Sequence, residues 1–405
     1  MSQSDWIRGA VGQGAEARVT RSGCKNVLVL VPHMPAADRL FDILPLFDGD
    51  HRIQQTFVVP DLNDPTDKPA RLIQDRDGHL VSWLQARHTR YDLALSAGRD
   101  GSDMVDAPVV LLAHGATKYQ TKAPVHRDDR RTVPITGLER HDLIRRGHLV
   151  ASALMLANHG ELRWLREVCP EAEPTAVVGG DLCFDRMRAS ARLREVYRQA
   201  LGVADGQRLV LVSSTWRTES TFGRHAELVR RLLDELPHRR YVVCAALHPN
   251  IWETHSGFQV RSWLADCLGD GLRLLPDGRF WQASVMAADL VLGDHGSVTQ
   301  YSAACDVPVV LAATGTEART PNSVGDLLSA RAPVLDMSEP LQPQLDSAIE
   351  EHAPGRHRLI ADLVTGRHGE SAAVFRETMY RLLDLPEPDR PAVTRPYAPP
   401  QWIRP

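Results

Sequence analysis

Residues 289–298, with the sequence DLVLGDHGSV, combine an apolar strand, a tight turn and the start of a helix. The first half is a short aliphatic run, which is typical of a strand that is buried on both faces. The turn contains Asp294 and Gly296, and Ser297 precedes a helical pattern over 298–305. A strand that leads through a short turn into a helix is the repeating unit of a parallel α/β sheet.

The same alternation of strand and helix extends along most of the chain. In the second half the pattern predicts strands over 208–213, 241–247, 272–275, 289–293 and 308–312, and helices over 224–236, 258–268, 280–287 and 298–305. In the first half it predicts strands over 26–31, 56–59, 91–96, 109–113 and 132–135, and helices over 36–47 and 80–90. A helix over 160–168 and a strand over 175–178 follow. Two such blocks in series predict an α/β protein with two doubly wound parallel-sheet domains that face a cleft.

The length of 405 residues also favours two domains, and proline and glycine cluster near 170–180, where we expect the boundary. We expect five segments: a flexible leader over 1–23, an N-terminal α/β domain over 24–172, a C-terminal α/β domain over 173–335, C-terminal helices over 336–385 and a proline-rich tail over 386–405. Seven prolines in the tail disfavour helix and strand, so we expect it to be extended on the surface or disordered. Trp402 is a side chain that can dock.

The composition excludes several classes of protein. A net charge of −4 gives no basic excess for binding nucleic acid, and no apolar run reaches the 18 residues of a membrane-spanning helix. The six cysteines form no CxxC pair and are expected to be reduced thiols of a cytoplasmic protein. The paired arginines at 145–146 and 230–231 are expected on solvated helix faces, and they leave a peripheral contact with the inner face of the membrane open.

Three successive strands of the second half end in polar residues. The first is followed by Ser214, Thr215, Trp216 and Arg217, the second by His248 and the third by Asp294, Gly296, Ser297 and Val298. Ligands of parallel sheets bind at the carboxyl ends of the strands, and the N-terminus of a helix presents unpaired N–H groups to an anion. We expect Gly296 to permit close approach of that anion and Ser297 to cap the helix. These residues predict a phosphate-binding site.

A second candidate site follows the apolar run 108–113 in the first half. His114 ends this run and Gly115 comes next, with Lys118 and Lys122 shortly after. The chain has only 4 lysines among its 47 basic residues, so two of them in one short segment form a notable cluster. Histidine is the side chain whose ordinary pKa lies closest to neutrality. The segment therefore predicts an acid–base group beside cations that can hold a phosphate.

The order of these motifs over about 105–315 resembles that of the CDP-glycerol glycerophosphotransferases, the teichoic-acid polymerases and primases of the GT-B class. In that family an HG motif with basic residues precedes a hydroxyl-Trp-Arg strand end, a His-Pro pair and an Asp-Ser-Ser turn. Here the matching segments are 114–122, 214–217, 247–249 and 294–297, and 177–185 stands for a Gly–Asp element. This chain departs from the family at Gly296, which replaces the first serine, and at Tyr301, which replaces an acidic residue; its lysines also lie at other offsets from the HG pair.

The resemblance implies a GT-B-like fold and the transfer of a glycerophosphate-like or glycosyl group from a nucleotide-diphosphate donor to an acceptor hydroxyl. It implies that His114 is the general base, and that His248, a second catalytic histidine, stabilises the departing nucleotide with Arg217 and the turn at Ser297. Gly115, Lys118 and Lys122 would bind the acceptor or its phosphate. The other donor-binding residues would be Ser214, Thr215, Trp216, Asp294, Gly296 and Val298.

Two other functions remain open. One is a nucleotide-sugar glycosyltransferase or a non-hydrolysing epimerase on the same fold. The other is a catalytically silent protein that binds a nucleotide, for which the departures at Gly296 and Tyr301 leave room. We expect no cofactor and no metal, because no HxxxH or HExxH spacing occurs and the 17 histidines are better explained as surface residues.

Overall fold

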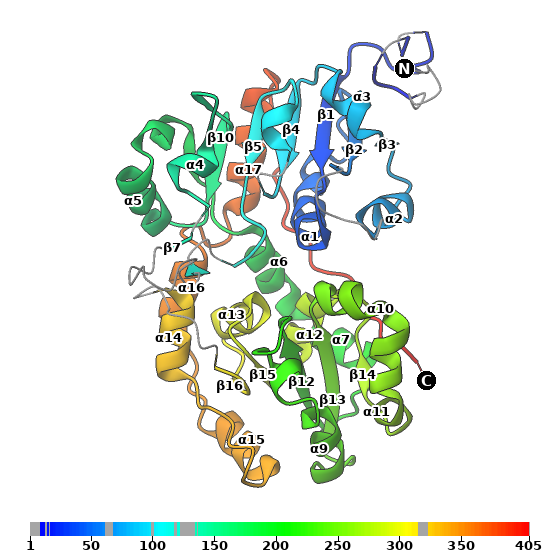
Figure 1. The fold of residues 1–405 in the computed structure, drawn as a ribbon, viewed down its shortest axis with the longest axis vertical. Coiled ribbons are helices and arrows are strands. Elements are labelled where there is room, and N and C mark those ends of the chain that lie inside the picture. The colour runs from blue at the N-terminus through cyan, green and yellow to red at the C-terminus, as the bar shows by residue number, and fades with distance from the viewer. Residues whose placement is uncertain are drawn as a thin grey trace. The chain divides into compact units, whose positions relative to one another are not determined.

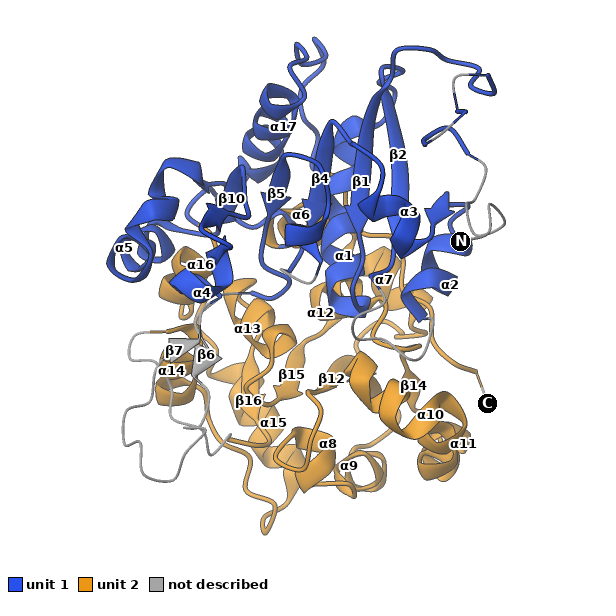
Figure 2. Cartoon of the chain, turned by 45° about the horizontal axis from the view of Figure 1, so that its top comes forward, with its two compact units in different colours: residues 1–118, 136–183, 366–394 blue, residues 119–135, 184–365, 395–405 orange. Residues whose placement is uncertain are grey.

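The computed structural model describes residues 9–12, 14–15, 17–60, 68–98, 101–116, 120–121, 134–135, 137–314 and 323–404. Its contacts divide the chain into two compact units (Figure 2). Unit 1 contains residues 1–118, 136–183 and 366–394, and unit 2 contains residues 119–135, 184–365 and 395–405. The domain bounds expected from the sequence stay a prediction. Lys118 and Lys122 lie outside the described residues.

Unit 1 is built on a seven-stranded parallel sheet with the order β11-β10-β5-β4-β1-β2-β3 (Figure 1). Its strands are β1 Lys25–Leu30, β2 Ile53–Val58, β3 Leu80–Val81, β4 Leu93–Ser96, β5 Val109–Leu111, β10 Ala153–Leu156 and β11 Ala176–Val178. Its helices are α1 Met34–Ile43, α2 Lys68–Gln74, α3 Trp83–Arg87, α4 Arg140–Leu143, α5 His159–Val168 and α17 Ser371–Leu382, with 3-10 turns at η2 Leu44–Phe47, η3 Ser102–Met104 and η4 Pro170–Thr175. A short hairpin joins β8 Ile144–Arg145 to β9 His148–Leu149.

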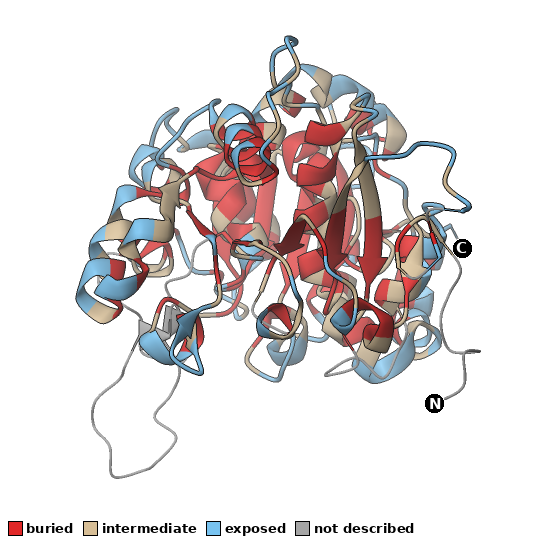
Figure 3. Cartoon of the chain, turned by 90° about the horizontal axis from the view of Figure 1, so that it is seen from above, coloured by how far each residue is buried: buried red, intermediate tan, exposed pale blue. Residues whose placement is uncertain are grey.

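Buried aliphatic residues explain why these strands form a two-sided sheet. Every residue from Val27 to Leu30 and from Leu93 to Ser96 is buried, which a parallel sheet covered on both faces requires. Helix α17 comes from the far end of the sequence but adds Phe375 and Met379 to the core beneath the sheet. We expected residues 336–385 to form a separate group of helices, whereas their last helix is part of unit 1. Figure 3 shows the buried residues concentrated in the strands.

Unit 2 is built on a five-stranded parallel sheet with the order β14-β13-β12-β15-β16. Its strands are β12 Arg208–Ser214, β13 Tyr241–Leu247, β14 Arg273–Leu274, β15 Leu290–Gly293 and β16 Val309–Leu311. Its helices are α7 Arg194–Ala200, α8 Thr221–Arg224, α9 Leu228–Glu235, α10 Pro249–Trp263, α11 Ala265–Gly269, α12 Trp281–Ala287, α13 Ser297–Ala304, α14 Val324–Arg331, α15 Leu341–Glu350 and α16 Arg358–Val364. A 3-10 turn, η5 Ala191–Leu193, precedes α7. The sequence boundary between the units, after Cys183, falls within helix α6 Leu182–Ser190, and β6 Gln120–Thr121 pairs with β7 Pro134–Ile135.

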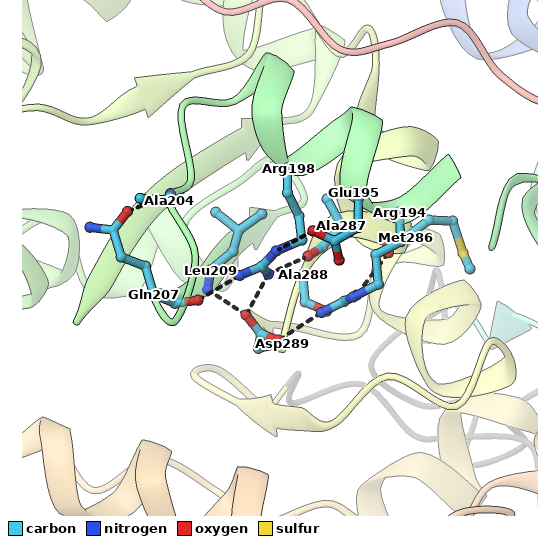
Figure 4. Close-up of polar contacts among 10 residues, drawn as sticks. All are labelled: Arg194, Glu195, Arg198, Ala204, Gln207, Leu209, Met286, Ala287, Ala288 and Asp289. Atoms are coloured by element: carbon cyan, nitrogen blue, oxygen red, sulfur yellow. Dashed lines mark hydrogen bonds and ion pairs between the residues drawn. The ribbon is translucent and has the colours of Figure 1, made fainter. Parts of the chain in front are cut away.

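An ion-pair network fastens α7 to the amino edge of this sheet (Figure 4). The carboxylate of Asp289 accepts hydrogen bonds from Arg194 at 2.6 Å, from Arg198 at 2.8 Å and from the backbone N–H of Leu209 at 2.7 Å. Both guanidinium groups also donate to carbonyl groups of residues 286–288. All of these polar groups are satisfied within the protein, so the network has a structural role.

The proline-rich tail lies against both units, each through its own stretch. Residues 386–394 contact unit 1, where Arg376 pairs with Glu387 at 2.6 Å. Residues 395–404 contact unit 2: Tyr397 accepts a hydrogen bond from Tyr197 at 2.7 Å, Trp402 stacks with Arg273, and the N–H of Ile403 donates to Leu274. The expectation that Trp402 docks is confirmed. The alternative of a disordered tail is wrong for the described residues, because its backbone and rings find specific partners.

Candidate functional site

The three polar strand ends predicted in the second half lie side by side in unit 2. Strand β12 pairs with β13 on one side and with β15 on the other, in parallel register. Their carboxyl ends therefore bring residues 214–217, His248 and residues 294–298 to one edge of the sheet. This juxtaposition follows from the strand order, which the sequence alone does not give.

Asp294 is fully buried and holds the loops of this edge together. One of its carboxylate oxygens accepts hydrogen bonds from the N–H and the hydroxyl of Thr215, both at 2.8 Å, and from the N–H of Thr221 at 3.0 Å. The other oxygen accepts from the N–H of Gly296 at 3.0 Å. In this structure its carboxylate is enclosed by protein donors, and donor binding by Asp294 stays a prediction. Thr221 is a member of this network that the sequence analysis missed.

Ser297 does not have the capping role expected of it, whereas the approach of an anion to Gly296 stays a prediction. Gly296, not Ser297, is the N-cap residue of α13, and no side chain caps the helix. A Cβ atom on Gly296 would lie 2.4 Å from the Cγ2 methyl of Thr215, so close packing against β12 requires glycine here. Ser297 and Val298 occupy the first turn of α13, where backbone N–H groups have no partner within the helix, and Ser297 is exposed. The expected capping role of Ser297 is therefore wrong, and anion binding by the first turn of α13 stays a prediction.

Tyr301, the second departure from the family pattern, is a core residue. Its side chain is fully buried, and its ring lies 5.5 Å from the ring of Trp281 in α12. An acidic side chain at this position would lose its hydration without gaining a partner of this kind. The departure at Tyr301 therefore reflects the packing of α13.

The strand ends of β12 and β13 bring aromatic and cationic groups together. Trp216 is 38% exposed, and its ring stacks with that of His248 at 6.4 Å, with an angle of 29° between the planes. Arg217 has a left-handed backbone (φ 85°) and holds its guanidinium group 4.5 Å from the centre of the Trp216 ring. Ser214 is buried, and its hydroxyl accepts from the N–H of Phe222 at 2.9 Å. Ser214 therefore supports the loop, while Trp216 and Arg217 are placed to meet a ligand.

His248 is the N-cap residue of α10. Its Nδ1 atom accepts a hydrogen bond from the backbone N–H of Asn250 at 3.1 Å. The backbone N–H of His248 donates to the carbonyl of Ser214 at 3.0 Å. A ring nitrogen that accepts cannot carry the proton, so the neutral ring is protonated at Nε2. The cap thereby fixes which nitrogen of His248 can donate.

In unit 1, His114 follows β5 and is exposed, as a group that meets substrate must be. Its carbonyl accepts a hydrogen bond from Arg39 of α1 at 3.5 Å, and Arg39 forms a buried ion pair with Asp181, also at 3.5 Å. A cavity of about 30 Å³ beside Gly115 is lined by Arg39, Asp181 and Glu161, among others. These buried charges anchor the loop that carries His114.

A second histidine, which the sequence analysis did not single out, contacts His114. The ring of His33, which follows β1, lies 4.8 Å from the ring of His114 in an edge-to-face arrangement. Strand β4 lies between β1 and β5, and the loop after β4 contains Gly98 close to both rings. The available signal is an apolar strand followed by His33, Pro35 and a helix over 25–43, which is similar to the strand, His248, Pro249 and helix of the second half except that Met34 separates the histidine from the proline.

The described residues were also expected to contain no metal site and no membrane-spanning helix. No group of three or more His, Cys, Asp or Glu side chains among them is arranged to hold a metal ion. Within the same part of the chain, no helix combines the length and the apolarity that crossing a membrane takes. The absence of a cofactor stays a prediction.

Comparison with known proteins rests on structure alone, since no protein-family model and no curated protein sequence matches the chain. A variant of the wall teichoic acid polymerase TagF aligns over 90% of each chain, with a TM-score of 0.63 and 13% identity. A TagF structure soaked with CDPG aligns over 89% of each, with a TM-score of 0.58 and 12% identity. A UDP-GlcNAc 2-epimerase from Neisseria meningitidis bound to UDP-GlcNAc covers 88% of this chain and 100% of its own, with a TM-score of 0.51 and 12% identity.

This protein has a GT-B-like α/β fold. The expected fold class is confirmed by these neighbours and by the two parallel sheets. The neighbours are enzymes according to their names, but at this identity their likeness extends to the fold alone.

Proposed function

We propose that the protein is a transferase that moves a glycerophosphate group from CDP-glycerol, or a closely related nucleotide-diphosphate donor, to an acceptor hydroxyl. The observation that carries the proposal is the carboxyl edge of the unit 2 sheet. There Asp294 links the segment after β12, residues 215–221, to the turn before α13, and this edge presents the first-turn N–H groups of α13, Arg217 and His248. These groups suit a diphosphate, because helix N-termini and guanidinium groups both bind phosphate oxygens.

In this proposal the donor binds to unit 2. Trp216 lies beside His248 and Arg217 and offers a partly exposed aromatic surface to the nucleotide. His248 donates from Nε2, the nitrogen that its cap leaves protonated, to an oxygen of the departing nucleotide. Fixed donors of this kind stabilise the charge that develops as the P–O bond breaks.

The acceptor binds to unit 1 and His114 takes the proton of its hydroxyl. The acceptor oxygen forms a bond to the phosphorus that bears the glycerol, the pyrophosphate P–O bond breaks, and CMP leaves with the electron pair. The proton remains on His114 until it is released to solvent. A positioned base of this type contributes roughly 10²- to 10⁴-fold to the rate. Lys118 and Lys122 stay predictions as phosphate-binding residues.

The test is release of CMP from CDP-glycerol in the presence of glycerol 3-phosphate as an acceptor. The wild-type protein should turn over, and His114→Ala should reduce kcat by about 10²-fold or more, while its melting temperature and its affinity for CDP stay close to wild type. An equal rate for the two proteins would exclude His114 as the base. The matched control is His159→Ala, an exposed histidine at the start of α5 in the same unit.

A second candidate is a nucleotide-sugar glycosyltransferase or epimerase, which the epimerase neighbour favours. It predicts stabilisation by UDP or a UDP-sugar and no release of CMP. Binding of a nucleotide without any turnover would support the third candidate, a catalytically silent protein. In all three candidates we propose that the protein meets its nucleotide ligand in the cytoplasm.

A further inference from the structure

His33 is the histidine of unit 1 that packs against His114. It follows β1, and its ring packs edge to face against His114, the proposed base, with 4.8 Å between ring centres and 78° between planes. His33 is half-buried, whereas His114 is exposed. The two rings come from loops 81 residues apart in the sequence, and the sheet order β5-β4-β1 brings these loops to the same edge.

The backbone fixes the proton position on His33. This residue is the N-cap of α1, and its Nδ1 atom accepts a hydrogen bond from the N–H of Ala36 at 3.1 Å. Because an accepting ring nitrogen has no hydrogen, the neutral His33 ring carries its proton on Nε2. The N-cap therefore makes Nε2 of His33 a hydrogen-bond donor throughout the pH range in which the ring is neutral.

The nitrogens of both histidines border one position next to Gly98. A Cβ atom built on Gly98 would lie 3.9 Å from Nδ1 of His114 and 3.9 Å from Nε2 of His33. Gly98 has a φ of +148°, a backbone conformation that side-chain-bearing residues rarely adopt, so glycine is favoured where a side chain would contact both nitrogens. Nδ1 of His114 and Nε2 of His33 thus lie close to the same point of the loop after β4.

We propose that His33 binds the acceptor by donating a hydrogen bond from Nε2 to an acceptor oxygen next to the hydroxyl that His114 deprotonates. The acceptor class that fits two such nitrogens is a compound with oxygens on neighbouring carbon atoms, such as a polyol or its phosphate ester. His33 then determines which acceptors bind, while His114 moves the proton. This inference rests on the proposed transferase function.

The two amide substitutions of His33 separate hydrogen bonding to an acceptor from helix capping. In His33→Asn the side-chain oxygen takes the place of Nδ1, so the cap is kept but the Nε2 donor is lost. In His33→Gln the amide N–H₂ takes the place of Nε2, so a donor is kept but the cap is weakened. A purely structural role would lower the melting temperature in His33→Gln and change nothing in His33→Asn.

The experiment is calorimetric titration of the full-length protein with glycerol 3-phosphate, followed by the CMP-release assay with the same compound. We expect His33→Asn to weaken binding and raise the acceptor KM by about tenfold, with kcat less affected, as loss of one neutral hydrogen bond implies. We expect His33→Gln to keep the acceptor affinity within about threefold of wild type and to melt at a lower temperature.

An unchanged dissociation constant in His33→Asn, or no binding of glycerol 3-phosphate to the wild-type protein, would overturn the inference. The His114→Ala variant distinguishes this failure from that of the proposed function. If His114→Ala abolishes turnover while His33→Asn binds as wild type does, the transferase proposal survives and His33 is only a cap. If the wild type binds glycerol 3-phosphate through His33 but releases no CMP, the transferase proposal fails while the acceptor contact stands.

Discussion

The two units use the same local arrangement at the carboxyl edge of their sheets but surround it with different side chains. In each, a histidine follows a buried strand, caps a helix that has a proline in its first turn, and is thereby protonated at Nε2 when neutral. His33 of unit 1 contacts another histidine, and His248 of unit 2 contacts Trp216. In the proposed mechanism this one local geometry serves acceptor binding in the first unit and stabilisation of the departing nucleotide in the second.

The units also differ in how they hold these loops. In unit 2 a single buried carboxylate, that of Asp294, accepts four hydrogen bonds, three from the segment 215–221 and one from Gly296. In unit 1 the loop of His114 is held by Arg39 and its ion pair with Asp181, at longer distances of 3.5 Å. We therefore expect a single substitution of the loop-holding residue to lower the stability of unit 2 more than that of unit 1.

The largest effect should come from Asp294→Asn. The amide keeps one acceptor but turns the other into a donor that faces N–H groups, so buried donors lose their partner at a cost of about 2–4 kcal/mol. We expect a melting temperature lower by roughly 5–15 °C, together with loss of CDP binding. Asp205→Asn, at an exposed position of the same unit, is the control. Equal melting temperatures for these two variants would show that the carboxylate does not order the loops.

The sequence predicted the strands of unit 2 well because each of them is a continuous apolar run bounded by polar turns. The strand 241–247 and the helix 280–287 agree with β13 and with α12 to within one residue. Strand β10, Ala153–Leu156, was missed because the run is short, and helices α6 and α7 were missed because their arginines obscure the apolar spacing. We expected a single helix over 80–90, but Ser82 caps α3 and separates it from β3.

For the site, the sequence identified residue types but not their roles. From the sequence, Asp294 is equally compatible with binding a ligand and with holding loops together from a buried position. Only the four hydrogen bonds that its carboxylate accepts in the structure distinguish these roles. The strand 175–178 was expected in the second domain, yet β11 pairs with β10 in unit 1. His33 was overlooked because its partner, His114, is distant in the sequence and the order of strands in the sheet is not encoded locally.

The next effect in size should follow removal of residues 395–405. These residues donate and accept backbone hydrogen bonds with Leu274, Tyr197 and Ser190, and Trp402 stacks on Arg273. Their loss should lower the stability of unit 2 by about 2–4 kcal/mol, or roughly 5–15 °C in a calorimetric scan, with little change in unit 1. A scan identical to that of the full chain would contradict the docking of the tail.

A smaller effect is a difference between the two units in how their stability depends on pH. His357 of unit 2 is 3% exposed, and its burial lowers its pKa to about 4. A lowered pKa stabilises the fold above the unfolded value of about 6.5, and this contribution is lost as pH falls from there toward 4. In unit 1 the side chain of Arg52 holds the pKa of Asp50 well below its usual range, so that contribution is lost only below about pH 4.

Unit 2 should therefore lose about 1–3 kcal/mol of stability between pH 6.5 and pH 4 through His357. The measurement is urea unfolding at several pH values, with His357→Gln compared with His238→Gln, an exposed histidine of the same unit. The pH dependence should be weaker in His357→Gln and unchanged in His238→Gln. Identical pH profiles for both variants would contradict the effect of burial on His357.

The central claim, that unit 2 holds a nucleotide-diphosphate donor, is tested most directly by thermal unfolding with CDP, CDP-glycerol, UDP, GDP and UDP-GlcNAc. A ligand at about 100 times its dissociation constant adds about 2.7 kcal/mol, which raises the melting temperature by roughly 5–10 °C. We expect CDP and CDP-glycerol to stabilise the wild type and His114→Ala equally, and Arg217→Ala much less. No shift with any of the nucleotides, or an equal shift in Arg217→Ala, would contradict the account.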